Sequence, residues 1–253
     1  MKFIGIDLAW TYKNETGICI LDSNGHVEYM NAQVYTNEEI IELIKAHHNE
    51  HLTIAIDAPL VVNNAGGSRG AEGEMMRAKI NGHRVFAFNA NRNYFNKVFG
   101  GIRGEALMHM IQNAVPDIQV GFSRTASSIV ETFPTGIVAG LFPEIAPVKY
   151  KRKPKMTHEE TVSEMERLLA RFEKLETGEE LVSNLEYSLR AAGSTKRELK
   201  HLEDKVDALL CAYAMFALHT KVATAQTFGT IDKGFITIPV RGPGLERPSS
   251  GMN

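Results

Sequence analysis

Two short runs of β-forming residues, fifty positions apart, each lead directly into an aspartate. Phe3–Ile6 precedes Asp7, and the apolar run Leu52–Ile56 precedes Asp57. A continuous apolar run of this length is typical of a strand buried on both faces of a parallel sheet. Residues that follow such strands lie at the carboxyl edge, where open α/β sheets bind ligands. A fold that pairs the two runs would therefore bring two carboxylates together.

The segment between the two aspartates predicts two more strands and a helix. Gly17–Leu21 and Val27–Val34 are β-rich and flank the turn sequence Asp-Ser-Asn-Gly, which is a hairpin signal. Thr36 followed by Glu39 forms a capping box, which opens a helix. The sequence thus predicts three antiparallel strands and a crossover helix, after which Leu52–Ile56 lies parallel to the first strand.

The rest of the chain predicts further helices and strands of the same α/β type. Helices are expected near 72–80 and 102–115, and a strand at 128–133 that Pro134 stops. Capping boxes at Thr157 and Thr195 open two long amphipathic helices, and an edge strand is expected at 235–240. We predict one domain spanning 1–253, with a helical insertion at about 149–192.

Composition excludes several classes of protein. Hydrophobic residues make up 43% and charged residues 23% of 253 residues, which is ordinary globular usage. The longest apolar stretch, Ala208–Leu218, is too short to cross a bilayer, and the amino terminus leads directly into a strand, so we expect no membrane association and a cytoplasmic location. Cys19 and Cys211 lie in apolar segments and are expected to be buried free thiols. The net charge of −2 argues against a surface that binds nucleic acids and other polyanions nonspecifically.

Asp7 and Asp57 would repel each other if their strands are neighbours. Like charges at short range raise one pKa unless a proton or a cation lies between them. A hard divalent cation fits two carboxylates well. The alternative is that each aspartate merely caps a turn, which is the better explanation for a single residue. For the pair, we favour a metal site.

Three more acidic residues extend this pattern. Glu131 ends a β-rich run just before a proline, although a surface turn residue is an open alternative. Asp204 and Asp207 are three positions apart and share one face of the last helix. Small residues follow Asp207, which would let this helix approach the sheet closely. The alternative is an acid favoured by the helix dipole, and it fits Asp204 better than Asp207.

Four segments together resemble an uncharacterised domain family of predicted nucleases with the RNase H-like fold. They begin at Gly5 (GIDLAW), Ala55 (AIDAPL), Glu131 (ETFP) and Asp204 (DKVDALLCA). The first and last segments also look like those of RuvC-type Holliday-junction resolvases, in which a D-x-x-D-A-L pattern supplies metal ligands. The resemblance implies an RNase H-like mixed sheet, flanked by helices, and four metal ligands: Asp7, Asp57, Asp204 and Asp207.

The same resemblance implies an activity. It predicts a nuclease that hydrolyses phosphodiester bonds in DNA or RNA with Mg²⁺ or Mn²⁺, with the catalytic residues Asp7, Asp57, Glu131 and Asp207. Asp7 would bridge two ions about 4 Å apart. Glu131 matches the predicted nucleases but has no clear counterpart in the resolvases.

Three residues after the second acidic strand resemble the family's R-x-x-acid pattern and are candidates for substrate binding: Arg69, Glu72 and Arg77. The arginines would clamp a phosphate through bidentate contacts, or they are ordinary charges on a helix surface. The run Lys149–Lys155 combines basic residues with one aromatic and is the best nucleic-acid patch that the sequence offers. We nevertheless favour a solvated linker there.

Two other functions stay open at this stage. One is an ATP-binding phosphotransferase of the actin and sugar-kinase superfamily, which needs two facing copies of the fold and glycine-rich phosphate loops. The sequence predicts one copy. The other is a noncatalytic binding module that has kept the RNase H-like fold.

Overall fold

The computed structural model describes residues 1–48, 51–151, 153–172, 188 and 195–242. Its centre is a six-stranded sheet in the order β3-β2-β1-β4-β6-β5. The strands are β1 (Lys2–Asp7), β2 (Thr16–Leu21), β3 (Val27–Gln33), β4 (Leu52–Ile56), β5 (Gln119–Val120) and β6 (Ser128–Glu131). Strand β2 is antiparallel to both of its neighbours, β1 and β3, whereas β4, β6 and β5 run parallel to β1. The predicted RNase H-like mixed sheet is confirmed.

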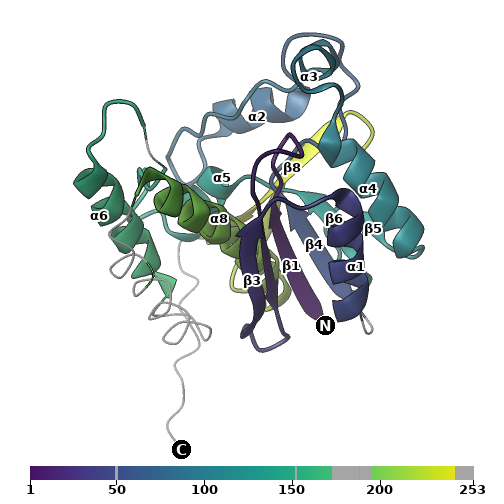
Figure 1. Ribbon diagram of the computed structural model, residues 1–253, viewed down its shortest axis with the longest axis horizontal. Helices are drawn as coiled ribbons and strands as arrows, with labels where there is room; N and C mark the ends of the chain where they lie inside the picture. The colour runs from purple at the N-terminus through teal and green to yellow at the C-terminus, as the bar shows by residue number, and fades with distance from the viewer. Residues whose placement is uncertain (49–50, 152, 173–187, 189–194, 243–253) are drawn as a thin grey trace, which may run out of the picture.

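Helices cover both faces of this sheet, as Figure 1 shows. On one face lie α5 (Pro134–Leu141), α6 (His158–Leu169) and α8 (Lys196–His219). On the other lie α1 (Asn37–His47) and α4 (Arg103–Ala114). The predicted capping boxes at Thr36, Thr157 and Thr195 are all present. Of the predicted insertion at about 149–192, the described part includes α6, and residues 152, 173–187 and 189–192 lie outside the described residues.

The pleat of the strands decides which side chains face which layer. In β1, Phe3 packs in the core under α8, whereas Ile4 and Ile6 pack in the core under α1 and α4. Alternation therefore turns Gly5 and Asp7 toward α8. In β4, Ala55 packs in the core under α8 and Ile56 in the opposite core, so Asp57 also faces α8.

Two glycines let α8 lie directly on the strands. A Cβ atom at Gly5 would lie 2.0 Å from the Ala208 carbonyl oxygen, and one at Gly17 would lie 2.0 Å from the Asp204 carbonyl oxygen. Neither position has room for a side chain, because backbone atoms of α8 fill the space. This close contact, which the small residues of α8 predict, fixes that helix over β1 and β2.

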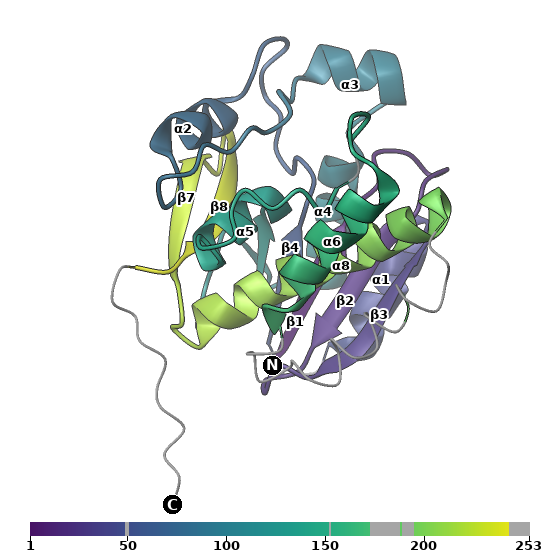
Figure 2. The same ribbon diagram turned by 90° about the vertical axis from the view of Figure 1, so that its left-hand side faces the viewer.

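A second sheet and two short helices complete the fold. Strands β7 (Thr224–Thr230) and β8 (Gly234–Val240) form an antiparallel pair that packs against α2 (Gly70–Ala78) and α5. The predicted strand at 235–240 is β8, and it pairs with β7 rather than with the main sheet. The segment that follows β4, with α2 and α3 (Arg92–Phe99), lies above the carboxyl ends of β1 and β4 (Figures 1 and 2). Within the described residues, none of the helices is both long and apolar enough for a membrane span.

The contact at Gly5 can be tested by adding a single methyl group. We expect Gly5→Ala to lower the free energy of unfolding by about 1–3 kcal/mol, because the Cβ atom would push α8 off the sheet. Gly66→Ala is the matched control, since no atom lies within 4 Å of the Cβ position there. Denaturant unfolding of both variants gives the comparison, and an equal effect of the two substitutions would contradict the close contact.

Candidate metal centre

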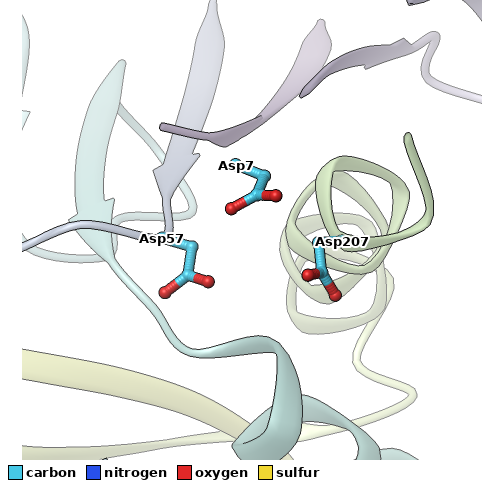
Figure 3. Close-up of side chains that lie close together, drawn as sticks. All are labelled: Asp7, Asp57 and Asp207. Carbon is cyan, nitrogen blue, oxygen red and sulfur yellow. The ribbon is translucent and has the colours of Figure 1, made fainter. Parts of the chain in front are cut away.

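Three carboxylates converge where β1, β4 and α8 meet. The backbone N–H of Asp57 donates to the Ile6 carbonyl at 2.8 Å, which sets Asp57 beside Asp7 on the neighbouring strand. Asp207 reaches the same point from α8 (Figure 3). One oxygen atom from each carboxylate lies within 4.8 Å of the others. Asp7 and Asp57 are half-buried and Asp207 is buried, so the cluster is partly open to solvent.

The three carboxylates resist being charged together. Burial raises the pKa of Asp7 well above its ordinary value, and the charges of Asp207 and Asp57 raise it further. Burial also raises the pKa of Asp57 to about 7, although Lys151 opposes this shift. A pKa of this kind means that protons are retained near neutral pH unless another cation replaces them.

The donor set fits a hard divalent cation. The convergent group that the described residues form contains carboxylate oxygens alone, with neither imidazole nor thiolate in it. Mg²⁺, Mn²⁺ and Ca²⁺ prefer oxygen ligands, whereas Zn²⁺ and Cu²⁺ favour sites with nitrogen or sulfur. Asp7, Asp57 and Asp207 are therefore the residues that would hold Mg²⁺ or Mn²⁺.

Asp207 is already held by two neighbours that the sequence did not single out for this site. The Tyr150 hydroxyl donates to Asp207 Oδ1 at 2.5 Å, and Lys151 Nζ lies 2.6 Å from Oδ2. Burial lowers the pKa of Lys151, but Asp207 and Tyr150 outweigh it and hold this pKa well above its ordinary value. Lys151 is therefore a charged ammonium group that partly neutralises the cluster.

The solvated linker that we predicted at 149–155 is wrong at these two positions. Tyr150 is only 2% exposed and packs in the core that contains α8, and its neighbour Lys151 contacts Asp207 in the acidic cluster. The one signal in the sequence is the aromatic residue within a basic run. A fully solvated segment is expected to contain polar residues, whereas a tyrosine ring is often buried.

Asp204 lies beside the convergent group rather than inside it. Its negative charge raises the pKa of Asp7, and its Oδ1 lies 2.7 Å from Lys200 Nζ. The same ammonium group also binds Glu203 at 2.8 Å. Asp204 is thus a fourth carboxylate next to the centre, and its predicted role as a metal ligand stays a prediction.

Glu131 lies on the opposite side of its strand from the cluster. It pairs in register with Ile56, the residue before Asp57, so the pleat turns it away from α8. Its carboxylate accepts a hydrogen bond from the Leu60 N–H at 2.9 Å and is bound by both terminal nitrogens of Arg69. Glu131 is 3% exposed, so the surface-turn alternative is wrong. A catalytic role for Glu131 stays a prediction.

Arg69 and Glu72 are buried as well, and the helix-surface alternative is wrong for both. Arg69 Nε donates to Glu72 Oε1 at 2.8 Å, while its terminal nitrogens bind Glu131 and the Val61 carbonyl. A phosphate could bind Arg69 only by displacing these partners. Phosphate binding by Arg69 therefore stays a prediction. Arg77 is exposed on α2, as the helix-surface alternative expects.

Together the fold and the site define an α/β protein with an RNase H-like sheet and a carboxylate cluster at its carboxyl edge. Residues 5–224 match the family model described as "Protein of unknown function (DUF429)", and the chain belongs to this family. The match includes Asp7, Asp57 and Asp207. Neither a curated protein nor a solved structure matches the chain.

The raised pKa of Asp57 predicts a pH-dependent stability without metal. A carboxyl group whose pKa rises from 3.8 to about 7 on folding binds its proton more tightly in the folded state. Its stabilising contribution is complete below about pH 4 and is lost as the pH rises through about 7. In EDTA, we expect the Tm of the wild type relative to Asp57→Asn to fall across this range. A pH-independent difference between the two proteins would count against the raised pKa.

Lys151 should compete with any cation at the centre. We expect Lys151→Met to tighten Mn²⁺ binding by roughly tenfold, the factor that corresponds to about 1.4 kcal/mol, because one positive charge beside Asp207 is removed. Lys149→Met is the matched control, since Lys149 is an exposed lysine two residues away. Isothermal titration calorimetry measures both. If Mn²⁺ binds Lys151→Met no more tightly than the control, the two cations do not compete.

Proposed function

We propose that the protein is a metal-dependent phosphodiesterase, and specifically a nuclease that cleaves DNA or RNA. The observation that carries this proposal is the convergence of Asp7, Asp57 and Asp207 within 4.8 Å at the carboxyl edge of the sheet. These carboxylates would hold Mg²⁺ or Mn²⁺, which would supply water activation and stabilisation of the leaving oxygen of a phosphodiester, in the two-metal manner.

Some residues of the chain would bind the cation, and others would orient those metal ligands. Asp7 and Asp57 come from adjacent strands of the sheet, which fixes their separation. The Tyr150 hydroxyl orients Asp207 by donating to Oδ1, while Lys151 contacts Oδ2 and balances its charge until a cation binds. Partners that orient ligands in this way keep a metal site preorganised. Lys151 would move from Asp207 toward substrate phosphate once a cation neutralises the cluster.

A hollow beside the centre supports an anionic substrate. It measures about 490 Å³ and lies between the Tyr150 segment and α8. Lys153 and Lys196 line it, together with Lys200, which is paired with Asp204 and with Glu203 of the same lining. Lysines on one side of a cleft attract phosphate groups and raise their local concentration.

Cys19 and Cys211 are buried and free, which fits the proposed cytoplasmic location, where thiols stay reduced.

The two other candidate functions fit the structure less well. An actin-like or sugar-kinase-like phosphotransferase needs two facing copies of the fold, whereas the described residues form one six-stranded sheet and a separate pair of strands. A noncatalytic module has no need for carboxylates that raise one another's pKa, because such a cluster costs stability near neutral pH.

Cleavage assays with Mg²⁺ or Mn²⁺ on single-stranded, duplex and branched substrates test the proposal. We expect metal-dependent cleavage by the wild type, and a loss of at least about a hundredfold in Asp7→Asn, because a ligand has more effect than the outer partners of a metal site. Asp117→Asn, which alters an exposed acid after α4, is the matched control. Equal cleavage by Asp7→Asn and the wild type would overturn the mechanism.

A further inference from the structure

One segment of the chain carries positive charge without any negative charge. Residues 75–104 contain six lysines and arginines and not one aspartate or glutamate, within a chain whose net charge is −2. Arg92 pairs with Glu105, and Arg103 is buried. The other four are exposed: Arg77, Lys79, Arg84 and Lys97. The segment therefore presents uncompensated cations to solvent.

Exposed aromatic rings lie in the same segment. Phe86 is 73% exposed, Phe88 42% and Tyr94 39%. Together with Val98, they make up four of the seven exposed large hydrophobic residues among the described residues. Exposure of large rings to water is unfavourable, and several exposed rings that lie together usually mark a binding site.

Phe88 and Tyr94 pack against each other and against the buried Phe95, and Phe88 also contacts Trp10. The Trp10 ring lies 4.8 Å from that of Phe88 and 5.2 Å from that of Phe95, measured between centroids. Tyr94 lies 5.2 Å from Phe88. We call Trp10, Phe86, Phe88 and Tyr94 the aromatic platform.

The platform lies on the same edge of the sheet as the carboxylates. Trp10 follows Asp7 by three residues, at the end of β1, and its ring contacts Phe95 and Phe99 of α3. Figures 1 and 2 both show α3 beyond the end of the sheet at which β1 and β4 finish. A chain bound across the platform would therefore lie at the edge that holds Asp7 and Asp57.

We propose that the aromatic platform and the cations of residues 77–97 bind single-stranded nucleic acid. Bases stack on Phe86, Phe88 and Tyr94, while Arg84 and Lys97 contact phosphates. Rings interleaved with lysine and arginine are what a flexible strand requires, and stacking needs base faces that a duplex keeps covered. A protein partner fits less well, since protein interfaces are depleted in lysine. This inference rests on the proposed nuclease function and names the substrate as single-stranded.

Binding can be measured without cleavage, in EDTA, with the complete protein. Trp10 is the chain's single tryptophan, so selectively excited tryptophan fluorescence reports on the platform alone. We expect a single-stranded oligothymidylate to quench this fluorescence, and a duplex of the same length to bind at least about fivefold more weakly, the equivalent of one lost stacking contact. Failure of the oligonucleotide to bind at low salt would overturn the proposal and leave a protein partner as the occupant.

Variants locate the binding surface by the anisotropy of a labelled oligonucleotide. We expect Phe86→Ala and Phe88→Ala each to weaken binding at least about fivefold. Lys97→Ala should weaken binding and reduce the dependence of log K on log salt by about 0.7. Val34→Ala and Lys45→Ala remove an exposed apolar group and an exposed charge elsewhere, and should bind normally. Thermal unfolding checks that each variant is folded.

The outcomes separate this inference from the nuclease proposal. If the strand binds but no metal-dependent cleavage occurs, the platform stands and the nuclease function fails. If the wild type cleaves nucleic acid while the three platform-segment variants bind like the controls, the nuclease function stands and the platform inference fails.

Discussion

The close contact between α8 and the strands β1 and β2 is the constraint on which the site depends. Gly5 and Gly17 leave no space between the strands and the backbone of the helix, so the helix cannot slide or lift without losing its core packing. Because Asp207 lies one residue before Ala208, the helix residue against Gly5, its carboxylate is fixed at the edge where β1 ends. Packing in the core thereby sets the geometry of a polar site.

The second constraint is that buried carboxylates need positive charge near them. The acidic cluster and the Arg69 network meet this need to different extents. At the cluster, Tyr150 and Lys151 occupy the oxygens of Asp207, yet the pKa of Asp7 is still raised by burial and by the neighbouring carboxylates. Behind it, Arg69 binds both Glu131 and Glu72 in a buried network. The second group has two carboxylates for one guanidinium, whereas the first has three carboxylates for one ammonium group, a larger excess of negative charge that a divalent cation would neutralise.

Local patterns predicted much of the fold and the centre of the site. The capping boxes, the hairpin turn and the two strands before Asp7 and Asp57 all follow from short stretches of sequence. Long-range features were missed, since Tyr150 reaches Asp207 across 57 positions, and β7 is too polar to resemble a strand. The helix that begins at Pro134 is a further difference from the prediction, because a proline that stops a strand is also suited to the first turn of a helix. The side of the strand on which Glu131 lies depends on its register with Ile56, and a single sequence does not reveal that register.

The most direct test of the metal centre is the anomalous diffraction of crystals soaked in millimolar Mn²⁺. We expect an anomalous peak coordinated by oxygens of Asp7, Asp57 and Asp207, with Lys151 displaced from its contact with Asp207. A structure without a peak between these carboxylates, in which Lys151 still binds Asp207, would contradict the assignment of this cluster as a divalent cation site.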